Sequence, residues 1–70
     1  MSTQKIDKRF GTIAIEKRFI AQEELLEALK IQIAEELAGN ERRLIGQILI
    51  DNGHITVEQI DEVLIAMGLL

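Results

Sequence analysis

An internal repeat constrains the fold of this chain more than any other feature of its sequence. The segment over residues 9–32 reappears over residues 44–67, so Arg9 aligns with Leu44 and Gly11 with Gly46. A repeat of this length is one supersecondary unit that is too small to bury its own apolar face. We therefore expect the two copies to pack on each other in one small domain, because a chain of 70 residues leaves no room for a second one.

Apolar residues recur every three or four positions along most of the chain, which predicts helices. Asp7 is a candidate N-cap of the first helix, and Thr56 with Gln59 has the spacing of a capping box. The expected helices run over about 7–17, 22–39, 44–51 and 56–68. The predicted fold is all-α, with four helices in two helix-turn-helix repeats. It has one domain over 7–70, a disordered segment over 1–6, and antiparallel pairing within each repeat because the connections are short.

The composition predicts an aliphatic core and a surplus of apolar surface. Hydrophobic residues make up 47% of the chain but aromatic residues only 3%. A bundle with more apolar residues than one core can hold often covers the surplus by binding a partner or a second copy. The expected partner-facing residues lie on the longest helix and at the C-terminal tail: Leu26, Ile31, Ile33, Leu37, Leu69 and Leu70.

Charge and composition exclude several classes of function. The net charge of −4 disfavours binding to a nucleic acid polymer. A reading of the last helix as a DNA-recognition helix is weak, because that helix lacks Lys and Arg and carries Glu58, Asp61 and Glu62. Cysteine is absent and His54 stands alone, so we expect no disulfide, metal, cofactor or catalytic site. No apolar run is long enough for direct membrane insertion, and we expect a cytoplasmic protein.

The two copies share a motif that carries a family resemblance. Its first copy opens with Arg9-Phe10-Gly11 and its second with Leu44-Ile45-Gly46. With the apolar positions that follow, the chain resembles the N-terminal domain of type II secretion and type IV pilus assembly ATPases, including the variant that binds cyclic di-GMP. The family pattern is approximately R-L-G-x-x-L-x-x-x-G-x-I. The resemblance implies a helical module that either docks onto a protein partner or holds cyclic di-GMP, and the phosphate loop of the ATPase itself is absent from this chain.

The resemblance and the positive charges together nominate ligand-binding residues. An Arg fork suits guanine, because it can donate two hydrogen bonds to one base edge. The second copy has Leu44 at the Arg position, with Arg43 one residue earlier, and the first copy has Arg18 where the family has Gly. The candidate ligand-binding residues are Arg9, Phe10, Gly11, Arg18, Gln32, Arg43 and Gly46.

Two features remain open to different interpretations. Gly11 and Gly46 inside helices cost about 1 kcal/mol each relative to Ala, which either close helix packing or the close approach of a ligand would offset. Three basic pairs, at 8–9, 17–18 and 42–43, are either solvated charges or one anion site that the repeat gathers at an end of the bundle. We expect a non-enzymatic interaction module, with cyclic di-GMP binding as the alternative.

Overall fold

The computed structural model contains four α-helices, as the repeat predicts. It describes the backbone of residues 2–41 and 43–70, and the side chains of the same ranges from Asp7 onward. The helices are α1 (Ser2–Glu16), α2 (Gln22–Leu37), α3 (Ile45–Asp51) and α4 (Val57–Ala66). They form an all-α bundle with no strand within the described residues.

Helix α1 begins earlier than the sequence predicts. The expected start was Asp7, but the helical backbone runs from Ser2. Residues 2–6 include no proline or glycine to stop the helix, and their lack of apolar periodicity hid it. The disorder expected over residues 1–6 stays a prediction, because Met1 and the side chains of residues 2–6 lie outside the described part of the chain.

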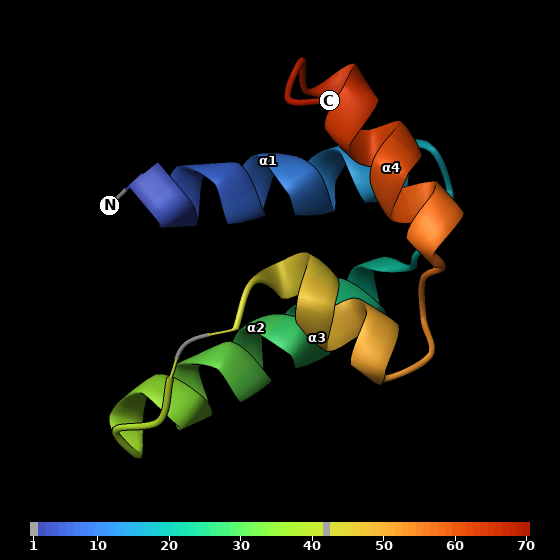
Figure 1. Ribbon diagram of the computed structural model, residues 1–70. Helices are drawn as coiled ribbons and strands as arrows, with labels where there is room; N and C mark the ends of the chain where they lie inside the picture. The colour runs from blue at the N-terminus through green and yellow to red at the C-terminus, as the bar shows by residue number, and fades with distance from the viewer. Residues whose placement is uncertain (1, 42) are drawn as a thin grey trace.

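The helices pack mainly across the two repeats. Figure 1 shows two layers, with α1 beside α4 in one and α2 beside α3 in the other. The tightest helix pairs are α2 with α3, α1 with α3, and α1 with α4. The expected antiparallel pairing within each repeat is therefore wrong. The core mixes residues of both repeats, so each helix buries its apolar face mainly against helices of the other repeat.

All four helices end in the same backbone turn. Each is followed by a residue with positive φ: Arg18 (63°), Gly39 (78°), Gly53 (77°) and Gly68 (77°). In every case the next amide bonds back five residues and the positive-φ residue bonds back three, which is the Schellman motif. Only Arg18 adopts this conformation without being glycine, so the first repeat carries a strained residue where the second has Gly53.

The buried core repeats with the sequence. Its members are Phe10, Ala14, Ile20 and Ala28 from the first repeat, and Ile45, Ile48, Leu49, Ile55 and Val63 from the second. Phe10 aligns with Ile45 and Ala28 with Val63, and Ile48 aligns with Ile13, which is half-buried. The expected aliphatic core is thus built from equivalent positions of the two copies, with Phe10 as its one aromatic side chain.

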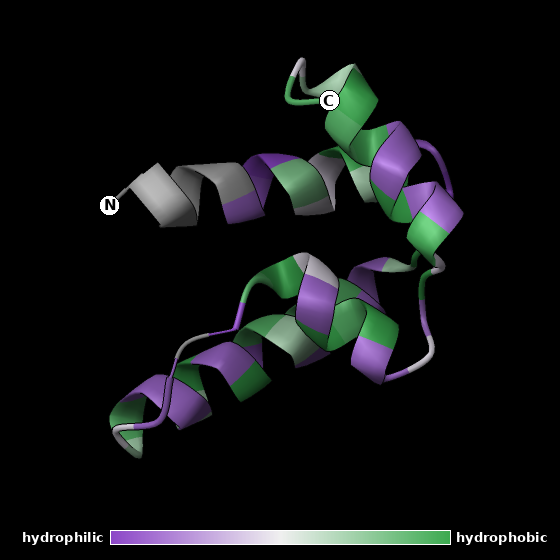
Figure 2. Cartoon of the chain, in the orientation of Figure 1, coloured by the Kyte–Doolittle hydropathy of each residue, from purple (hydrophilic) through white to green (hydrophobic). Residues whose placement is uncertain are grey.

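Apolar residues also remain on the surface. Helix α2 leaves Leu26 49%, Ile33 56% and Leu37 84% exposed, and the tail leaves Leu69 and Leu70 exposed. Figure 2 shows hydrophobic colour reaching the C-terminal end of α2, which projects away from α1. Single exposed apolar residues are common, whereas these three follow one another along one helix.

Candidate functional site: two equivalent apolar grooves

Two grooves in the surface are related by the internal repeat. The larger, about 590 Å³, lies between α1 and α2 and is called the α1/α2 groove. The smaller, about 330 Å³, lies where α1, α3 and α4 meet and is called the α3/α4 groove. The first is lined by Asp7, Lys8, Thr12, Leu25, Leu29, Gln32, Ile33, Glu36 and Leu37. The second is lined by Asp7, Phe10, Leu44, Gly46, Gln47, Ile50, Ile60 and Leu64.

Equivalent positions of the two repeats form the walls of both grooves. Thr12 aligns with Gln47, and Leu25 and Leu29 align with Ile60 and Leu64. The α1/α2 groove is longer on its α2 side, where Leu25, Leu29, Ile33 and Leu37 follow one another at four-residue spacing. Residues at this spacing share one face of a helix, so the α2 wall is a continuous aliphatic stripe.

A buried polar network lies between the two grooves and joins the repeats. Asp7 is 5% exposed, and its Oδ1 accepts from the Ile45 amide at 3.3 Å. Gln32 is 4% exposed, and its Nε2 donates to Asp7 Oδ2 and to the carbonyl of Arg43, both at 2.8 Å. Asp7 was expected to cap its own helix. It lies inside α1 instead and caps the first amide of α3, whose own N-cap residue Leu44 offers no side-chain acceptor.

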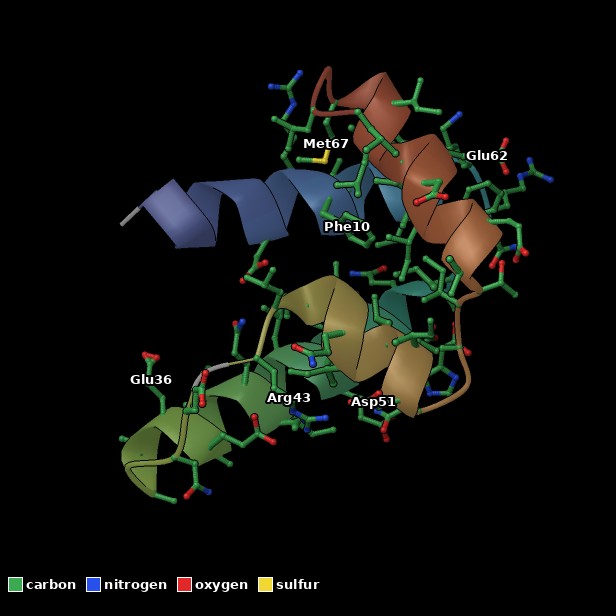
Figure 3. The ribbon with its side chains drawn as sticks, in the orientation of Figure 1. Phe10, Glu36, Arg43, Asp51, Glu62 and Met67 are labelled. Carbon is green, nitrogen blue, oxygen red and sulfur yellow. The ribbon has the colours of Figure 1, made fainter. Side chains whose placement is uncertain are left out.

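Three of the candidate ligand residues face the interior. Phe10 belongs to the core, and Figure 3 shows its ring between α1 and the α3 layer. The side-chain amide of Gln32 donates hydrogen bonds to Asp7 and to the Arg43 carbonyl. A Cβ at Gly11 would lie 2.7 Å from Leu25 Cδ1, so the absence of a side chain here lets the Leu25 side chain pack directly against α1. Phe10 and Gln32 each border a groove despite their burial, Gly11 borders neither, and direct ligand contact by these three residues stays a prediction.

Gly46 has a related packing role but a more open position. A Cβ there would lie 3.2 Å from Phe10 Cζ, so the Phe10 ring rests against the α3 backbone. Gly46 also lines the α3/α4 groove and is half-buried. Close packing therefore accounts for both helical glycines, and only Gly46 also borders a groove.

Arg43 is held by two carboxylates. Its Nε and Nη2 donate to Glu35 on α2, with the shortest distance 2.5 Å, and its Nη1 donates to Asp51 Oδ2 at 2.7 Å. The hydrogen bonds that Arg43 donates to Glu35 contribute most to raising the pKa of Arg43 above its usual range, and desolvation lowers this pKa by a smaller amount. Figure 3 shows Arg43 and Asp51 on the α2–α3 side of the molecule, and neither residue lines a groove. Arg43, expected to bind a ligand, thus links α2 to α3.

The basic pairs do not share one groove among the described residues. Lys8 lines the α1/α2 groove, whereas Arg9 and Arg18 are exposed and line neither groove. Arg43 is paired with Glu35 and Asp51, and Arg42 lies outside the described residues. Of the described residues in these pairs, only Lys8 contributes a positive charge to a groove.

The partner-facing residues fall into two groups. Ile33 and Leu37 line the α1/α2 groove and are well exposed, and Leu26 continues the exposed row on α2. Ile31 is half-buried and packs against the core, unlike the exposed members of this set, and its place on a partner surface stays a prediction. Leu69 and Leu70 are exposed but line neither groove.

His54 forms contacts that the sequence did not indicate. Its Nδ1 lies 3.2 Å from Glu24 Oε2 and its Nε2 lies 3.4 Å from Glu27 Oε1, so the turn before α4 is tied to the first half of α2. Sequence reasoning also missed Asp7, Lys8 and Thr12 as groove residues. The apolar periodicity of α1 marks its buried face and gives no sign of the flank that borders a groove.

Comparison with known proteins adds no relative. No protein-family model, curated protein or solved structure matches the chain. No group of His, Cys, Asp and Glu side chains suited to a metal ion occurs among the described residues. Within that same part of the chain, no helix has the length and apolarity needed to cross a membrane.

Proposed function

We propose that this chain is a non-enzymatic protein-interaction module that binds an apolar helical segment in the α1/α2 groove. The observation that carries the proposal is the aliphatic stripe along the α2 wall, with Ile33 and Leu37 left 56% and 84% exposed. Grooves of this kind receive amphipathic helices through anchors at three- and four-residue spacing. The same resemblance that predicts the fold also implies docking onto a protein partner.

The polar residues of the groove support a helical occupant. Lys8 and Thr12 stand on the α1 wall, opposite the stripe on α2. Glu36 also lines the groove, and Figure 3 shows it near the C-terminal end of α2. An apolar floor with polar groups on its edges is the usual anatomy of a protein interface, in which the centre supplies affinity and the rim supplies orientation.

Photocrosslinking in the native cells tests this proposal. The photoreactive residue p-benzoylphenylalanine replaces Leu37 in the groove, and in a matched variant it replaces Ile65, which is 58% exposed on α4 and lines neither groove. We expect a discrete protein adduct from position 37 and none of the same mass from position 65. Equal or absent adducts at both positions would remove the α1/α2 groove as the binding surface.

Cyclic di-GMP binding is the second candidate. The observation in its favour is the pair of equivalent grooves, each lined by residues of one motif copy. Against it, Phe10, Gly11 and Gln32 are buried and Arg43 is paired with carboxylates. Calorimetric titration with cyclic di-GMP decides between the two, because a two-groove receptor should release or absorb heat at high micromolar ligand and an interaction module should not.

A further inference from the structure

The surface of the chain is large for its size. Its accessible area is 4812 Å², whereas a folded monomer of 7.9 kDa should expose about 4400 Å². The fold is also elongated, with extents of 32 × 23 × 17 Å, because the C-terminal half of α2 diverges from α1. An isolated domain of this size has a marginal core, and covering the α1/α2 groove would extend it.

The groove and the groups that could fill it lie on the same face. Ile33 and Leu37 form part of its α2 wall and also project from it. A surface that carries both a concave apolar site and an exposed apolar ridge can pair with a copy of itself about a two-fold axis, since each ridge enters the other groove. A foreign partner would have to supply the ridge, but a second copy already has it.

The charges of the two helices complement each other between copies. Two exposed residues of opposite charge line the groove, Lys8 on its α1 wall and Glu36 on its α2 wall. When the α2 ridge of one copy enters the groove of the other about a two-fold axis, Glu36 of each copy can lie beside Lys8 of the other, which favours association.

We infer that the occupant of the α1/α2 groove is a second copy of this chain, in a two-fold dimer whose seam is the Ile33–Leu37 ridge. This inference rests on the proposed function and names its partner. A standard interface buries about 800 Å² on each copy, roughly a sixth of the 4812 Å² of the chain. The dimer joins α1 and α2 of each copy into a four-helix layer.

Sedimentation equilibrium on the purified full chain tests the dimer. We expect the mass to rise with concentration toward twice 7.9 kDa. Ile33→Asp, at 56% exposure, should raise the dissociation constant at least about tenfold, because it places a charge in the apolar seam. Ile65→Asp is the matched control, with the same residue type at 58% exposure outside the groove, and should change it less than about twofold.

Two further variants keep the test decisive. Leu37→Asp also places a charge in the seam, at a residue that is 84% exposed and contributes little to the monomer core. It replaces Ile33→Asp in the test if circular dichroism shows that Ile33→Asp is unfolded. Lys8→Glu should weaken the dimer most at low salt, since it reverses the charge of the α1 wall. A wild-type chain that stays monomeric to about 1 mM, or equal loss in the Ile33 and Ile65 variants, overturns the inference. The proposed function survives that result if the crosslinked adduct at position 37 contains another protein.

Discussion

At the scale of single residues, Arg18 shows most clearly where the two repeats differ. It holds φ at 63°, where the other three helix ends place glycine. An L-residue pays about 1–2 kcal/mol for this conformation, because its Cβ approaches the carbonyl oxygen that follows. The Arg18 side chain is exposed and forms no hydrogen bond or ion pair with another described residue. The fold therefore gains nothing visible from arginine at this position.

Arg18→Gly should stabilise the protein. We expect a gain of about 0.5–1 kcal/mol in the free energy of unfolding, since relief of the strained φ exceeds the added entropy of the unfolded chain. Arg9→Gly is the control, because Arg9 is an exposed arginine within α1, where glycine should cost about 1 kcal/mol. Urea denaturation measures both, and a destabilised Arg18→Gly would mean that the arginine makes a stabilising contact.

At the scale of helices, the start of α3 depends on a residue from another element. Leu44 cannot cap the helix with its side chain, and Asp7 of α1 accepts the Ile45 amide instead. Gln32 of α2 fixes the second Asp7 oxygen and the Arg43 carbonyl. One carboxylate thus joins three helices at a buried point between the grooves.

Asp7→Ala should destabilise the fold by about 2–4 kcal/mol, because it leaves the buried Ile45 and Gln32 donors without this acceptor. Thr56→Ala is the comparison, since it removes only the local cap of α4 and should cost about 1 kcal/mol. Hydrogen exchange of the Ile45 amide, followed by NMR, reports the cap directly. Unchanged protection of that amide in Asp7→Ala would show that α3 does not depend on α1.

The Arg43 pairs with Glu35 and Asp51 should be sensitive to salt but not to moderately alkaline pH. The pKa of Arg43 is raised in the folded state, so its contribution is complete below the ordinary arginine pKa and is lost only as the pH rises through the raised value. We expect Arg43→Gln to lower the Tm by an amount that is constant between about pH 7 and pH 10. That decrement should shrink in 1 M NaCl. Arg9→Gln, which removes an exposed arginine outside this cluster, should show no such salt dependence.

These element-scale features show what the sequence could and could not predict. The capping box of Thr56 and Gln59 was predicted and is confirmed, with both hydrogen bonds present at 3.0 and 3.1 Å. Such a cap is local, so its residue spacing identifies it. Asp7 was assigned to its own helix because the cap of α3 connects residues 38 positions apart, and no local rule reaches that far.

At the scale of the whole molecule, the repeat predicted the core but not the connectivity of its packing. Equivalent apolar positions are buried in both copies, as the aligned periodicity requires. The sequence did not reveal that the tightest helix pairs would cross between repeats, because apolar periodicity marks the buried face of a helix and not the helix that covers it. The grooves follow from this crossing: α1 and α2 diverge because their main contacts lie on other helices.

Cross-repeat packing implies that neither repeat is a folding unit. Residues 1–40 contain α1 and α2, and residues 41–70 contain α3 and α4. Each of the three tightest helix pairs joins a helix of one fragment to a helix of the other. Helices of at most 16 residues are marginal in water without tertiary contacts. Each fragment alone should therefore be largely unfolded, and an equimolar mixture should recover helical circular dichroism at 222 nm with a concentration-dependent midpoint.

Phe10 provides the specific control for this fragment experiment. Its ring belongs to the first fragment and packs against Gly46 of the second, so the contact forms only when the fragments associate. Phe10→Ala should cost about 3–5 kcal/mol, enough to abolish recovery at micromolar concentration. Lys17→Ala, an exposed change in the same fragment, should leave recovery intact. The expectation fails if each fragment is helical on its own and its helicity does not change on mixing. Each repeat would then fold alone, and the cross-repeat contacts would form only after folding.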